Sequence, residues 1–322
     1  MIKIAIVGFG TVGQGVAELF ARKRAEIEGK IGEFKVVAIA DLTGSIFGEF
    51  RLEDAIESRK KGRLPENRSA MEIVEEEDYD VLIEVTTTKL DESGILYMKK
   101  ALEKGASVIT SNKSIAVDLP GLLKLAESKN AHLMFEATVG GAMPIIKLLK
   151  KYLALCEILG VRGILNGTCN YILTRMEEEK LPYKQILGEA QEMGIAEANP
   201  SADVEGIDAG IKLVILANTI GIPAKFGDVH IEGITKITPQ AFEVAMRKGF
   251  TIRLIAEVSR KNLQVSPRLV PLNSPLAIKG TLNAAMIKTD TAGDIFVAGR
   301  GAGKLETATA ILSDLYELVG TH

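Results

Sequence analysis

The sequence contains no tryptophan, only two cysteines and only three histidines among its 322 residues. Cys156 and Cys169 lie far from every histidine in the sequence, so neither a disulfide framework nor a zinc site is expected. We interpret both thiols as buried or partly buried side chains. The most apolar helical stretch, residues 213–217, is much shorter than the ~18 residues that a membrane span requires. No membrane partner is therefore expected.

Neither sign of charge is in large excess, because 39 Lys and Arg side chains face 42 Asp and Glu side chains. The net charge of −3 provides no surplus for holding a phosphate backbone, which argues against nucleic acid as a partner. The chain begins with the strand-like segment Met1 to Val7 and carries no basic, apolar leader, so we expect a cytoplasmic protein. Its composition and length are typical of a globular protein with two domains.

Short β-branched runs alternate with amphipathic segments in the first part of the chain. This alternation predicts an α/β fold over residues 1–135, in which helices cover both faces of a parallel sheet. The expected strands are Ile2 to Val7, Val36 to Ala40, Val81 to Val85, Ser107 to Thr110 and His132 to Phe135. The expected helices are Val12 to Glu28, Leu52 to Lys61, Ala70 to Glu77, Glu92 to Lys104 and Leu119 to Asn130. The basic stretch Arg59 to Arg63 is interpreted as a solvated connector.

The pattern changes after residue 135, where helical segments precede a cluster of longer strands. This order predicts a second, α+β domain over residues 136–298 with a mixed or antiparallel sheet, while residues 299–322 return to the first domain. The expected helices are Tyr171 to Glu179, Tyr183 to Met193, Val204 to Ile220 and, in the returning segment, Lys304 to Val319. The expected strands are Glu157 to Leu165, Phe250 to Arg260, Leu263 to Val270, Ala285 to Thr289 and Ile295 to Ala298.

A glycine-rich turn joins the first expected strand to the first expected helix. Residues 8–13 fit the pattern G-x-G-x-x-G, which in this context is typical of a Rossmann-type dinucleotide site. Gly8 would make the tight turn, Gly10 would let the backbone approach a pyrophosphate, and Gly13 would let helix and strand pack closely. The alternative is a glycine turn without a ligand.

Asp41 follows the second expected strand, where a carboxylate can bind the ribose hydroxyl of NAD. Such a carboxylate would repel the 2′-phosphate of NADP, so this residue favours NAD. NADP stays open, because Arg51 lies in the following segment and Asp41 could instead serve only as a turn residue.

Carboxylates and a lysine gather in residues 190–212. Asp203 is expected to cap a helix, and Asp208 and Lys212, four residues apart, are expected on one face of it. An exposed ion pair of this kind would contribute only ~0.3–0.5 kcal/mol. The apolar run that follows Lys212 and the nearby Glu197 instead favour a site that binds a substrate ammonium group.

Residues 190–212 match the pattern A-x3-G-[apolar]-[small]-x2-[D/N]-P-x2-D-[apolar]-x-G-x-D-x3-K, and the chain thereby resembles the homoserine dehydrogenases. Further segments resemble the same family, so the similarity covers nearly the whole chain. These segments are residues 110–113 (T-x-N-K), 136–144 (E-A-[ST]-V-G), 166–172 (N-G-T-x-N-Y-I) and 299–303 (a glycine turn). Cys169, in the third of them, is not expected to be a nucleophile.

The resemblance implies NAD(P)-dependent reduction of L-aspartate 4-semialdehyde to L-homoserine, in threonine, methionine and isoleucine biosynthesis. It implies Lys212 as proton donor, Lys113 as second lysine, Glu197 and Asp208 as substrate ligands and Asp203 as support for the lysine. The two lysines, Glu197 and Asp208 would then meet beside the nicotinamide. The expected cofactor contacts are Gly8, Phe9, Gly10, Thr11, Val12, Gly13, Asp41, Thr86, Lys113 and Gly303.

The resemblance also implies a homodimer built on the sheet of the second domain, and a monovalent cation, Na+ or K+. The cation ligands would be Glu136, Val139, Gly141 and Met143, although Ala142 replaces a glycine that many members have. Two alternatives are a nucleotide-sensing protein without chemistry and a dehydrogenase acting on aspartate itself. The first predicts loss of the acid and lysine set, and the second does not explain residues 199–212.

Overall fold

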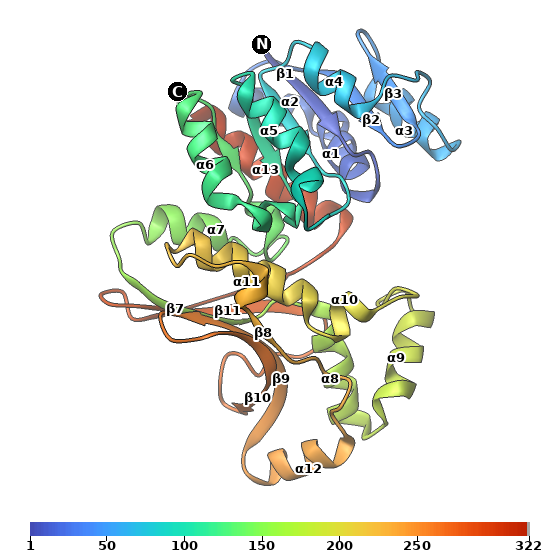
Figure 1. Cartoon of the computed structure of the whole chain (residues 1–322). Coiled ribbons are helices and arrows are strands. Elements are labelled where there is room, and N and C mark those ends of the chain that lie inside the picture. Colours follow the sequence, from blue (N-terminus) through green and yellow to red (C-terminus); the bar gives the residue numbers. More distant parts are fainter. Residues whose placement is uncertain (321–322) are drawn as a thin grey trace. The chain divides into compact units, whose positions relative to one another are not determined.

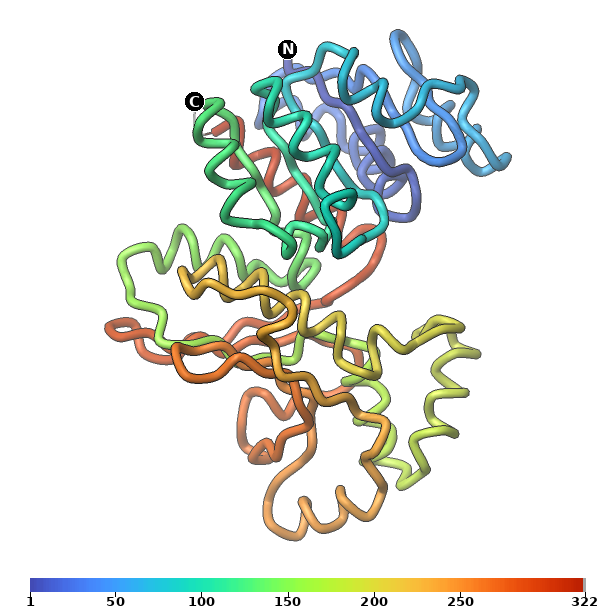
Figure 2. Tube along the Cα trace, viewed as in Figure 1, coloured from blue at the N-terminus to red at the C-terminus, as the bar shows by residue number. Residues whose placement is uncertain are grey.

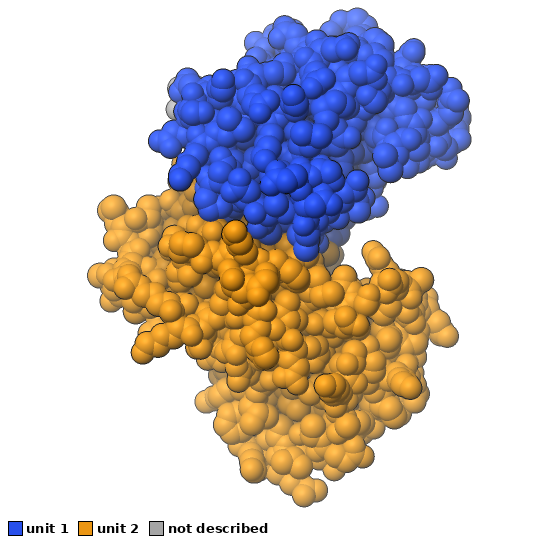
Figure 3. All heavy atoms as spheres, viewed as in Figure 1, with its two compact units in different colours: residues 1–142, 303–322 blue, residues 143–302 orange. Residues whose placement is uncertain are grey.

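The computed structural model describes residues 1–320 and contains two six-stranded sheets, one in each of two compact units (Figures 1 and 3). Unit 1 comprises Met1–Ala142 together with the C-terminal segment that begins at Gly303, and unit 2 comprises Met143–Ala302. Figure 2 traces the chain from the blue and green part of unit 1 through unit 2 and back in red. The nucleotide motif and the acid–lysine motif therefore belong to different units.

The sheet of unit 1 has the strand order β3-β2-β1-β4-β5-β6. Its strands are parallel except for β3, which pairs with β2 in the antiparallel direction. The strands are β1 (Ile2–Val7), β2 (Phe34–Asp41), β3 (Gly44–Phe47), β4 (Val81–Glu84), β5 (Ser107–Thr110) and β6 (Leu133–Met134). This sheet confirms the predicted Rossmann-type architecture. The antiparallel strand β3 was not predicted, because its four residues lie in the segment after Asp41 where the pattern loosens.

Helices cover both faces of this sheet. They are α1 (Thr11–Arg22), α2 (Arg24–Ile31), α3 (Leu52–Lys60), α4 (Ala70–Glu76), α5 (Leu96–Glu103), α6 (Leu119–Ser128) and α13 (Lys304–Gly320). In Figure 1, α5 and α6 lie on one face, whereas α1 and α13 lie against each other on the other face. The predicted first helix, Val12 to Glu28, is in fact two helices that meet at Lys23.

The C-terminal helix α13 completes the core of unit 1. Its buried side chains Ala308, Ile311, Leu315 and Leu318 belong to the same apolar cluster as Phe20 of α1. Gly15 of α1 makes this packing possible, because a Cβ atom there would lie 2.7 Å from the backbone oxygen of Lys304. Residues nearly 300 positions apart in the sequence therefore form one core.

The sheet of unit 2 has the strand order β12-β11-β7-β9-β10-β8 and is mixed, since β8 alone pairs in the parallel direction. Its strands are β7 (Ile158–Ile164), β8 (His230–Ile231), β9 (Phe250–Ser259), β10 (Leu263–Pro271), β11 (Leu282–Thr289) and β12 (Asp294–Arg300). The predicted mixed sheet is confirmed.

The helices of unit 2 are α7 (Ile145–Lys147), α8 (Gly167–Glu179), α9 (Tyr183–Glu192), α10 (Ser201–Val204), α11 (Ile207–Thr219) and α12 (Pro239–Arg247). Helix α11 packs on β9 and β10, and residues 208–217 of this helix are buried. The prediction that Asp203 caps this helix is wrong, because Asp203 lies inside α10 and Gly206 is the N-cap of α11. Gly206 has a φ of +86°, which turns the chain sharply between the two helices and favours glycine there.

Candidate active site

The three motif glycines of unit 1 each meet a different steric demand. Gly8 has a φ of +95°, and a Cβ atom there would lie 2.5 Å from the backbone of Val85. A Cβ atom on Gly13 would lie 2.1 Å from the oxygen of Gly8, whereas one on Gly10 would have no atom within 4 Å. The turn is thus packed on both sides and open at Gly10, where the fingerprint places the pyrophosphate.

Helix α1 begins at this open position. Gly10 is its N-cap without any side-chain cap, Thr11 is exposed, and the first turn contains no acidic residue. The unpaired N–H groups and the positive end of the helix dipole favour an anion at such a terminus. The buried Phe9 side chain belongs to the core, so only its backbone lies in the turn. Val12 packs against the same core.

Asp41 lies at the end of β2 and already has three hydrogen bonds. Its Oδ1 accepts from the backbone N–H of Thr43 at 2.7 Å and from the Thr43 hydroxyl at 2.6 Å. Its Oδ2 lies 2.7 Å from Nε of Arg59. Interpreting Arg59 as part of a solvated connector was wrong, because it lies on α3 and pairs with Asp41. Arg51 is instead the exposed N-cap of that helix and lies 3.7 Å from Glu53.

The predicted second lysine, Lys113, starts a 3-10 helix just after β5 and is partly buried. Asn112 caps this helix by accepting from the backbone N–H of Ser114 at 2.9 Å. Thr86, at the end of the neighbouring strand β4, lies beside the same segment, because Nδ2 of Asn112 donates to its hydroxyl at 3.1 Å. Gly303, with a φ of +138°, precedes α13 and accepts a hydrogen bond from Thr307.

In unit 2, the side chain of Lys212 is fixed at two points. Its Nζ donates to the backbone oxygen of Leu165 at 2.7 Å and lies 2.8 Å from Oδ2 of Asp208. Lys212 and Asp208 are only 8% and 9% exposed, so the interpretation as an exposed ion pair is wrong. Within the described part of the chain two of the three ammonium donors are thereby engaged, by Leu165 and by Asp208.

Asn166 joins the two acids of this cluster. Its Nδ2 donates to Oδ1 of Asp203 at 2.6 Å and to Oδ2 of Asp208 at 3.0 Å, while its Oδ1 caps α8 by accepting from the N–H of Cys169. One amide thus orients both carboxylates around the lysine. Asn283 adds a second donor to the oxygen of Leu165, at 3.1 Å.

Glu197 lies outside that hydrogen-bond network, whereas Cys169 is part of it. Glu197 is exposed in the loop between α9 and α10, where its backbone oxygen accepts from Gln191. Cys169 is fully buried, and this burial, together with the charge of Asp203, raises the pKa of its thiol. A raised pKa opposes a role as nucleophile. The structure therefore brings together Lys212, Asp208 and Asp203 but not Glu197.

The predicted cation ligands lie in one short segment, which begins with the 3-10 helix Glu136–Thr138 and continues as a loop. Glu136 is 3% exposed, and its backbone N–H donates to Asp314 at 2.9 Å. Gly141 has a φ of +56°, and Val139 and Met143 are buried. Ala142 adopts an ordinary negative φ, since Asn130 and Lys180 are the non-glycine residues with positive φ among the described ones. The alanine is therefore compatible with the backbone of this loop.

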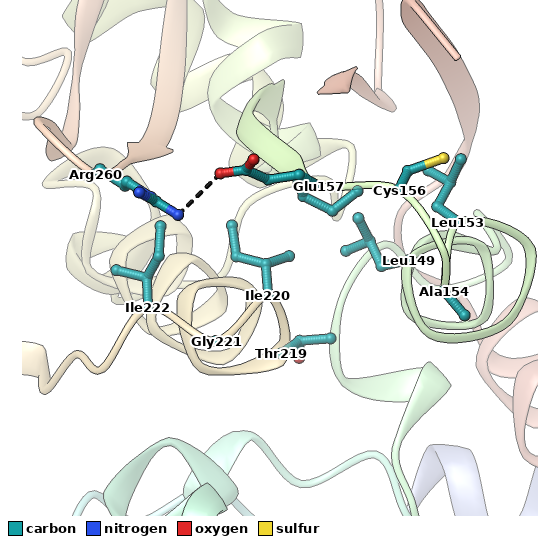
Figure 4. Close-up of a pocket in the computed structure, with 11 residues that line it drawn as sticks. Leu149, Leu153, Ala154, Cys156, Glu157, Thr219, Ile220, Gly221, Ile222 and Arg260 are labelled. Atoms are coloured by element: carbon teal, nitrogen blue, oxygen red, sulfur yellow. Dashed lines mark hydrogen bonds and ion pairs between the residues drawn. The ribbon is translucent and has the colours of Figure 1, made fainter. Parts of the chain in front are cut away.

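A hollow of about 300 Å³ in unit 2 lies away from these residues. Figure 4 shows the ion pair of Arg260 and Glu157 at one side of it, beside Ile220 and Ile222. None of the predicted site residues lines this hollow, so its position gives no support to the predicted chemistry. Over residues 1–320, no group of three His, Cys, Asp or Glu side chains forms a metal site, and no helix has the length and hydropathy of a membrane span.

Sequence reasoning missed several residues that form hydrogen bonds to predicted site residues or to the direct partners of those residues. Asn166 stood in a recognised segment without a role, Arg59 was taken for surface, and Leu165, Asn283 and the buried Glu84 were not considered. The N-G-T segment was the one available signal for Asn166, because an asparagine before a helix is a strong capping residue. The partners of the others lie far away in the sequence.

Both units of the chain resemble known proteins. Two family models match: "Homoserine dehydrogenase" over residues 144–316, and "Homoserine dehydrogenase, NAD binding domain" over residues 8–136. The homoserine dehydrogenase of Methanocaldococcus jannaschii is 44% identical, with 98% of each chain covered. The homoserine dehydrogenase of Neisseria gonorrhoeae is 35% identical, and the match covers 98% of this chain and 72% of the Neisseria protein.

Solved structures give the same result. A crystal structure from Archaeoglobus fulgidus, provisionally named a homoserine dehydrogenase, has a TM-score of 0.96 and 65% identity, with 99% of each chain covered. A hyperthermophilic archaeal homoserine dehydrogenase in complex with NADPH has a TM-score of 0.88 and 32% identity, and covers 100% of this chain and 98% of its own. With both units matched in sequence and in fold, the chain belongs to the homoserine dehydrogenase family.

Proposed function

We propose that the Asp208–Lys212 cluster carries out the proton-transfer half of the family's reaction. The enzyme is an NAD(P)-dependent oxidoreductase that interconverts L-aspartate 4-semialdehyde and L-homoserine. In the direction of reduction, a hydride reaches the aldehyde carbon, negative charge grows on the aldehyde oxygen, and that oxygen must receive a proton. A positioned ammonium group stabilises the developing charge and supplies the proton.

The observation that carries this proposal is the two-point fixation of Lys212. One N–H donor is held by Leu165 at 2.7 Å and another lies toward Asp208 at 2.8 Å. The remaining N–H donor therefore has a fixed direction, toward which we place the substrate oxygen. The carboxylate of Asp208 lies against the ammonium group at this distance and orients it for the transfer in either direction.

We assign the carboxylates to recognition of the substrate ammonium group. Asp208 and Glu197 are the proposed ligands, and Asp203 supports the lysine by sharing the amide of Asn166 with Asp208. Because Glu197 is exposed on a loop, we expect it to contribute to the KM for homoserine more than to kcat. We assign Lys113 of unit 1 as the second lysine of the site, on the family motif and on its place after β5.

Unit 1 fits a dinucleotide cofactor, because the turn is open at Gly10 and no acid lies in the first turn of α1. When bound, the cofactor supplies or accepts the hydride. We propose that Asp41 and Arg59 together set the preference between NAD and NADP. The carboxylate of Asp41 favours ribose hydroxyls, whereas Arg59, 2.7 Å from it, offsets part of the repulsion of a 2′-phosphate. We therefore expect a preference for NAD that is only moderate.

A direct assay tests the proposed chemistry. Purified protein is mixed with homoserine and each oxidised cofactor, and the absorbance of the reduced nicotinamide is followed. We expect turnover with both cofactors and a higher kcat/KM with NAD. Cofactor binding without turnover, on folded protein, would instead support a nucleotide-sensing protein. Turnover with aspartate but not with homoserine would contradict the proposed substrate.

We further propose that two copies of the chain pair through the second sheet. On one of its faces, Phe296 is 40% exposed beside Met286, and the pair of Arg162 and Glu257 lies on the same face. An apolar patch with a polar neighbour is typical of a homodimer interface. Light scattering, which measures the molar mass in solution, tests this assignment. We expect the wild type to be a dimer and the Phe296→Asp variant to be a monomer.

Two smaller assignments complete the proposal. The loop from Glu136 to Met143 would hold Na+ or K+ through the carboxylate and backbone oxygens, as in some family members; kcat/KM measured in sodium, potassium and tetramethylammonium buffers tests this. An equal rate in all three buffers would contradict it.

The cytoplasm is the proposed location, and cell fractionation with an antibody against the chain tests that assignment.

A further inference from the structure

Glu84, the last residue of β4, is a buried carboxyl group that the chemistry above does not use. It is 0% exposed and lies at the carboxyl edge of the parallel sheet of unit 1. Three donors converge on its Oε1: the backbone N–H of Thr86 at 3.0 Å, the Thr86 hydroxyl, and Nδ2 of Asn112 at 3.2 Å. The Thr110 hydroxyl lies 3.0 Å from Oε2. Burying a carboxyl group costs free energy unless hydrogen bonds compensate for the lost water contacts. The four donors around Glu84 provide this compensation, and they tie its side chain to the neighbouring segments.

The donors come from the two chain segments that flank the expected nicotinamide position. Thr110 and Asn112 belong to the segment that ends in Lys113, and Asn112 in turn caps the 3-10 helix that starts at this lysine. Thr86 and Val85 belong to the strand end against which Gly8 packs. Glu84 is thus the common acceptor of the strand end that lies beside the glycine turn and of the lysine segment.

The hydroxyl of Thr110 extends this connection to the backbone. It accepts from the N–H of Asn112 at 2.9 Å and lies 2.8 Å from the backbone oxygen of Glu84. Side chain and main chain of Glu84 therefore hold the first residues after β5 at several points. Segments of this length without such contacts are free to shift, and a shift of about 1 Å at a catalytic group can lower the rate by roughly 10².

We propose that Glu84 is a positioning residue for Lys113: it fixes the T-x-N-K segment against the end of β4 and so sets the place of the lysine ammonium. The proposal rests on the proposed role of Lys113. Glutamine is expected to replace glutamate, because its amide oxygen accepts the same bonds as Oε1 and its NH2 group can donate to Thr110. Alanine leaves the donors of Thr86 and Asn112 buried without their acceptor.

A double-mutant cycle separates positioning from general loosening of the fold. We expect Glu84→Ala to lower kcat by roughly 10- to 100-fold, and Glu84→Gln to stay within about threefold of the wild type. In the Lys113→Ala background, Glu84→Ala should change kcat by less than about threefold, because the group that it positions is already absent. Equal effects of Glu84→Ala in both backgrounds would overturn the proposal.

Two further variants serve as controls in case Glu84→Ala folds poorly. Thr110→Val removes one arm of the network with little change of shape, and it should show the same dependence on Lys113 if Glu84→Ala does not fold. Tyr79→Phe removes another buried hydrogen bond of unit 1, the 2.7 Å bond to the oxygen of Val74, and should lower stability while leaving kcat unchanged. If Lys113→Ala alone retains the kcat of the wild type, the assignment of Lys113 fails. If Lys113→Ala lowers kcat but the effects of the two substitutions are additive, the role of Lys113 stands and only the positioning role of Glu84 is rejected.

Discussion

Nζ of Lys212 lies 2.7 Å from the backbone oxygen of Leu165, the residue that follows the end of β7. A helix side chain is thereby tied to a strand end 47 residues earlier in the chain. The next residue, Asn166, caps α8 and donates to both Asp203 and Asp208. The two residues that follow β7 therefore contact the lysine, the two carboxylates and the start of α8. The ammonium group of Lys212 is held by a backbone oxygen as well as by the charge of Asp208.

Replacing Lys212 should separate chemistry from binding. We expect Lys212→Ala to lower kcat by roughly 10² to 10⁴, the usual contribution of a general acid, with cofactor affinity nearly intact because the cofactor turn is in unit 1. Lys212→Arg should be similarly impaired, since arginine keeps its proton. Lys279→Ala, which removes a surface lysine paired with Glu178, is the matched control. A fully active Lys212→Ala would reject the assigned role.

Asn166→Asp should make the acid cluster sensitive to pH. Aspartate retains the capping acceptor of α8, but it places a third carboxylate within hydrogen-bonding distance of Asp203 and Asp208. Mutual repulsion raises the pKa of such groups, so the unfolding free energy of the variant should fall relative to the wild type as the pH rises. Urea unfolding at acidic and alkaline pH measures this. Asn262→Asp, on the surface, should show no such trend.

The cofactor preference should follow the Asp41–Arg59 pair. We expect Asp41→Ala to weaken NADH binding more than NADPH binding, and Arg59→Gln to do the reverse. Titration of cofactor fluorescence gives both dissociation constants. Asp41→Asn keeps an acceptor for Thr43 and removes only the charge, so it separates loss of the turn from loss of charge. Equal losses for both cofactors in every variant would show that this pair does not contact the ribose.

The two thiols should react at very different rates. Cys156 is partly exposed, whereas burial raises the pKa of the Cys169 thiol and hides its sulfur. We expect a chromogenic disulfide reagent at mildly alkaline pH to modify Cys156 in the native protein, and to reach Cys169 only after unfolding. In Cys156→Ser, native protein should give almost no signal. Rapid reaction of that variant would contradict the burial of Cys169.

Glu84 should impose a pH dependence on stability. Burial raises the pKa of its carboxyl group above the ordinary value of 4.5, despite the donors around it. The folded state then binds more protons than the unfolded state between these two pKa values, so this contribution to stability is complete below pH ~4.5 and is lost as the pH rises. Glu84→Gln lacks this loss. Its unfolding free energy should therefore rise relative to the wild type on going from pH 5 to pH 8.

Sequence patterns predicted the periodic part of this protein well. The alternation of short strands and amphipathic helices predicted the parallel sheet, and the spacing of Gly8, Gly10 and Gly13 predicted a turn whose steric demands the structure reproduces. Such patterns are local, because each depends on neighbours within one or two turns. The four-residue spacing of Asp208 and Lys212 placed both on one helix face, and they form one buried pair.

What sequence reasoning missed depends on contacts between distant segments. Glu84 was not singled out within the predicted strand Val81 to Val85, because its partners Thr110 and Asn112 lie 26 and 28 residues later. Arg59 looked like surface in a basic stretch, since nothing local indicated that α3 brings it back to Asp41. The wrong cap at Asp203 had a local cause. The periodicity predicted one helix from Val204 to Ile220, but the left-handed φ of Gly206 ends α10 and starts α11 at Ile207.

The return of α13 to unit 1 has a consequence for biosynthesis. The apolar stripe of that helix, Ala308, Ile311, Leu315 and Leu318, fills the core of unit 1, yet it is translated only after the whole of unit 2. Unit 2 is complete in sequence before this helix leaves the ribosome, whereas the N-terminal sheet must wait with part of its interior uncovered. The nascent N-terminal segment of unit 1 therefore has to remain unaggregated while unit 2 is synthesised.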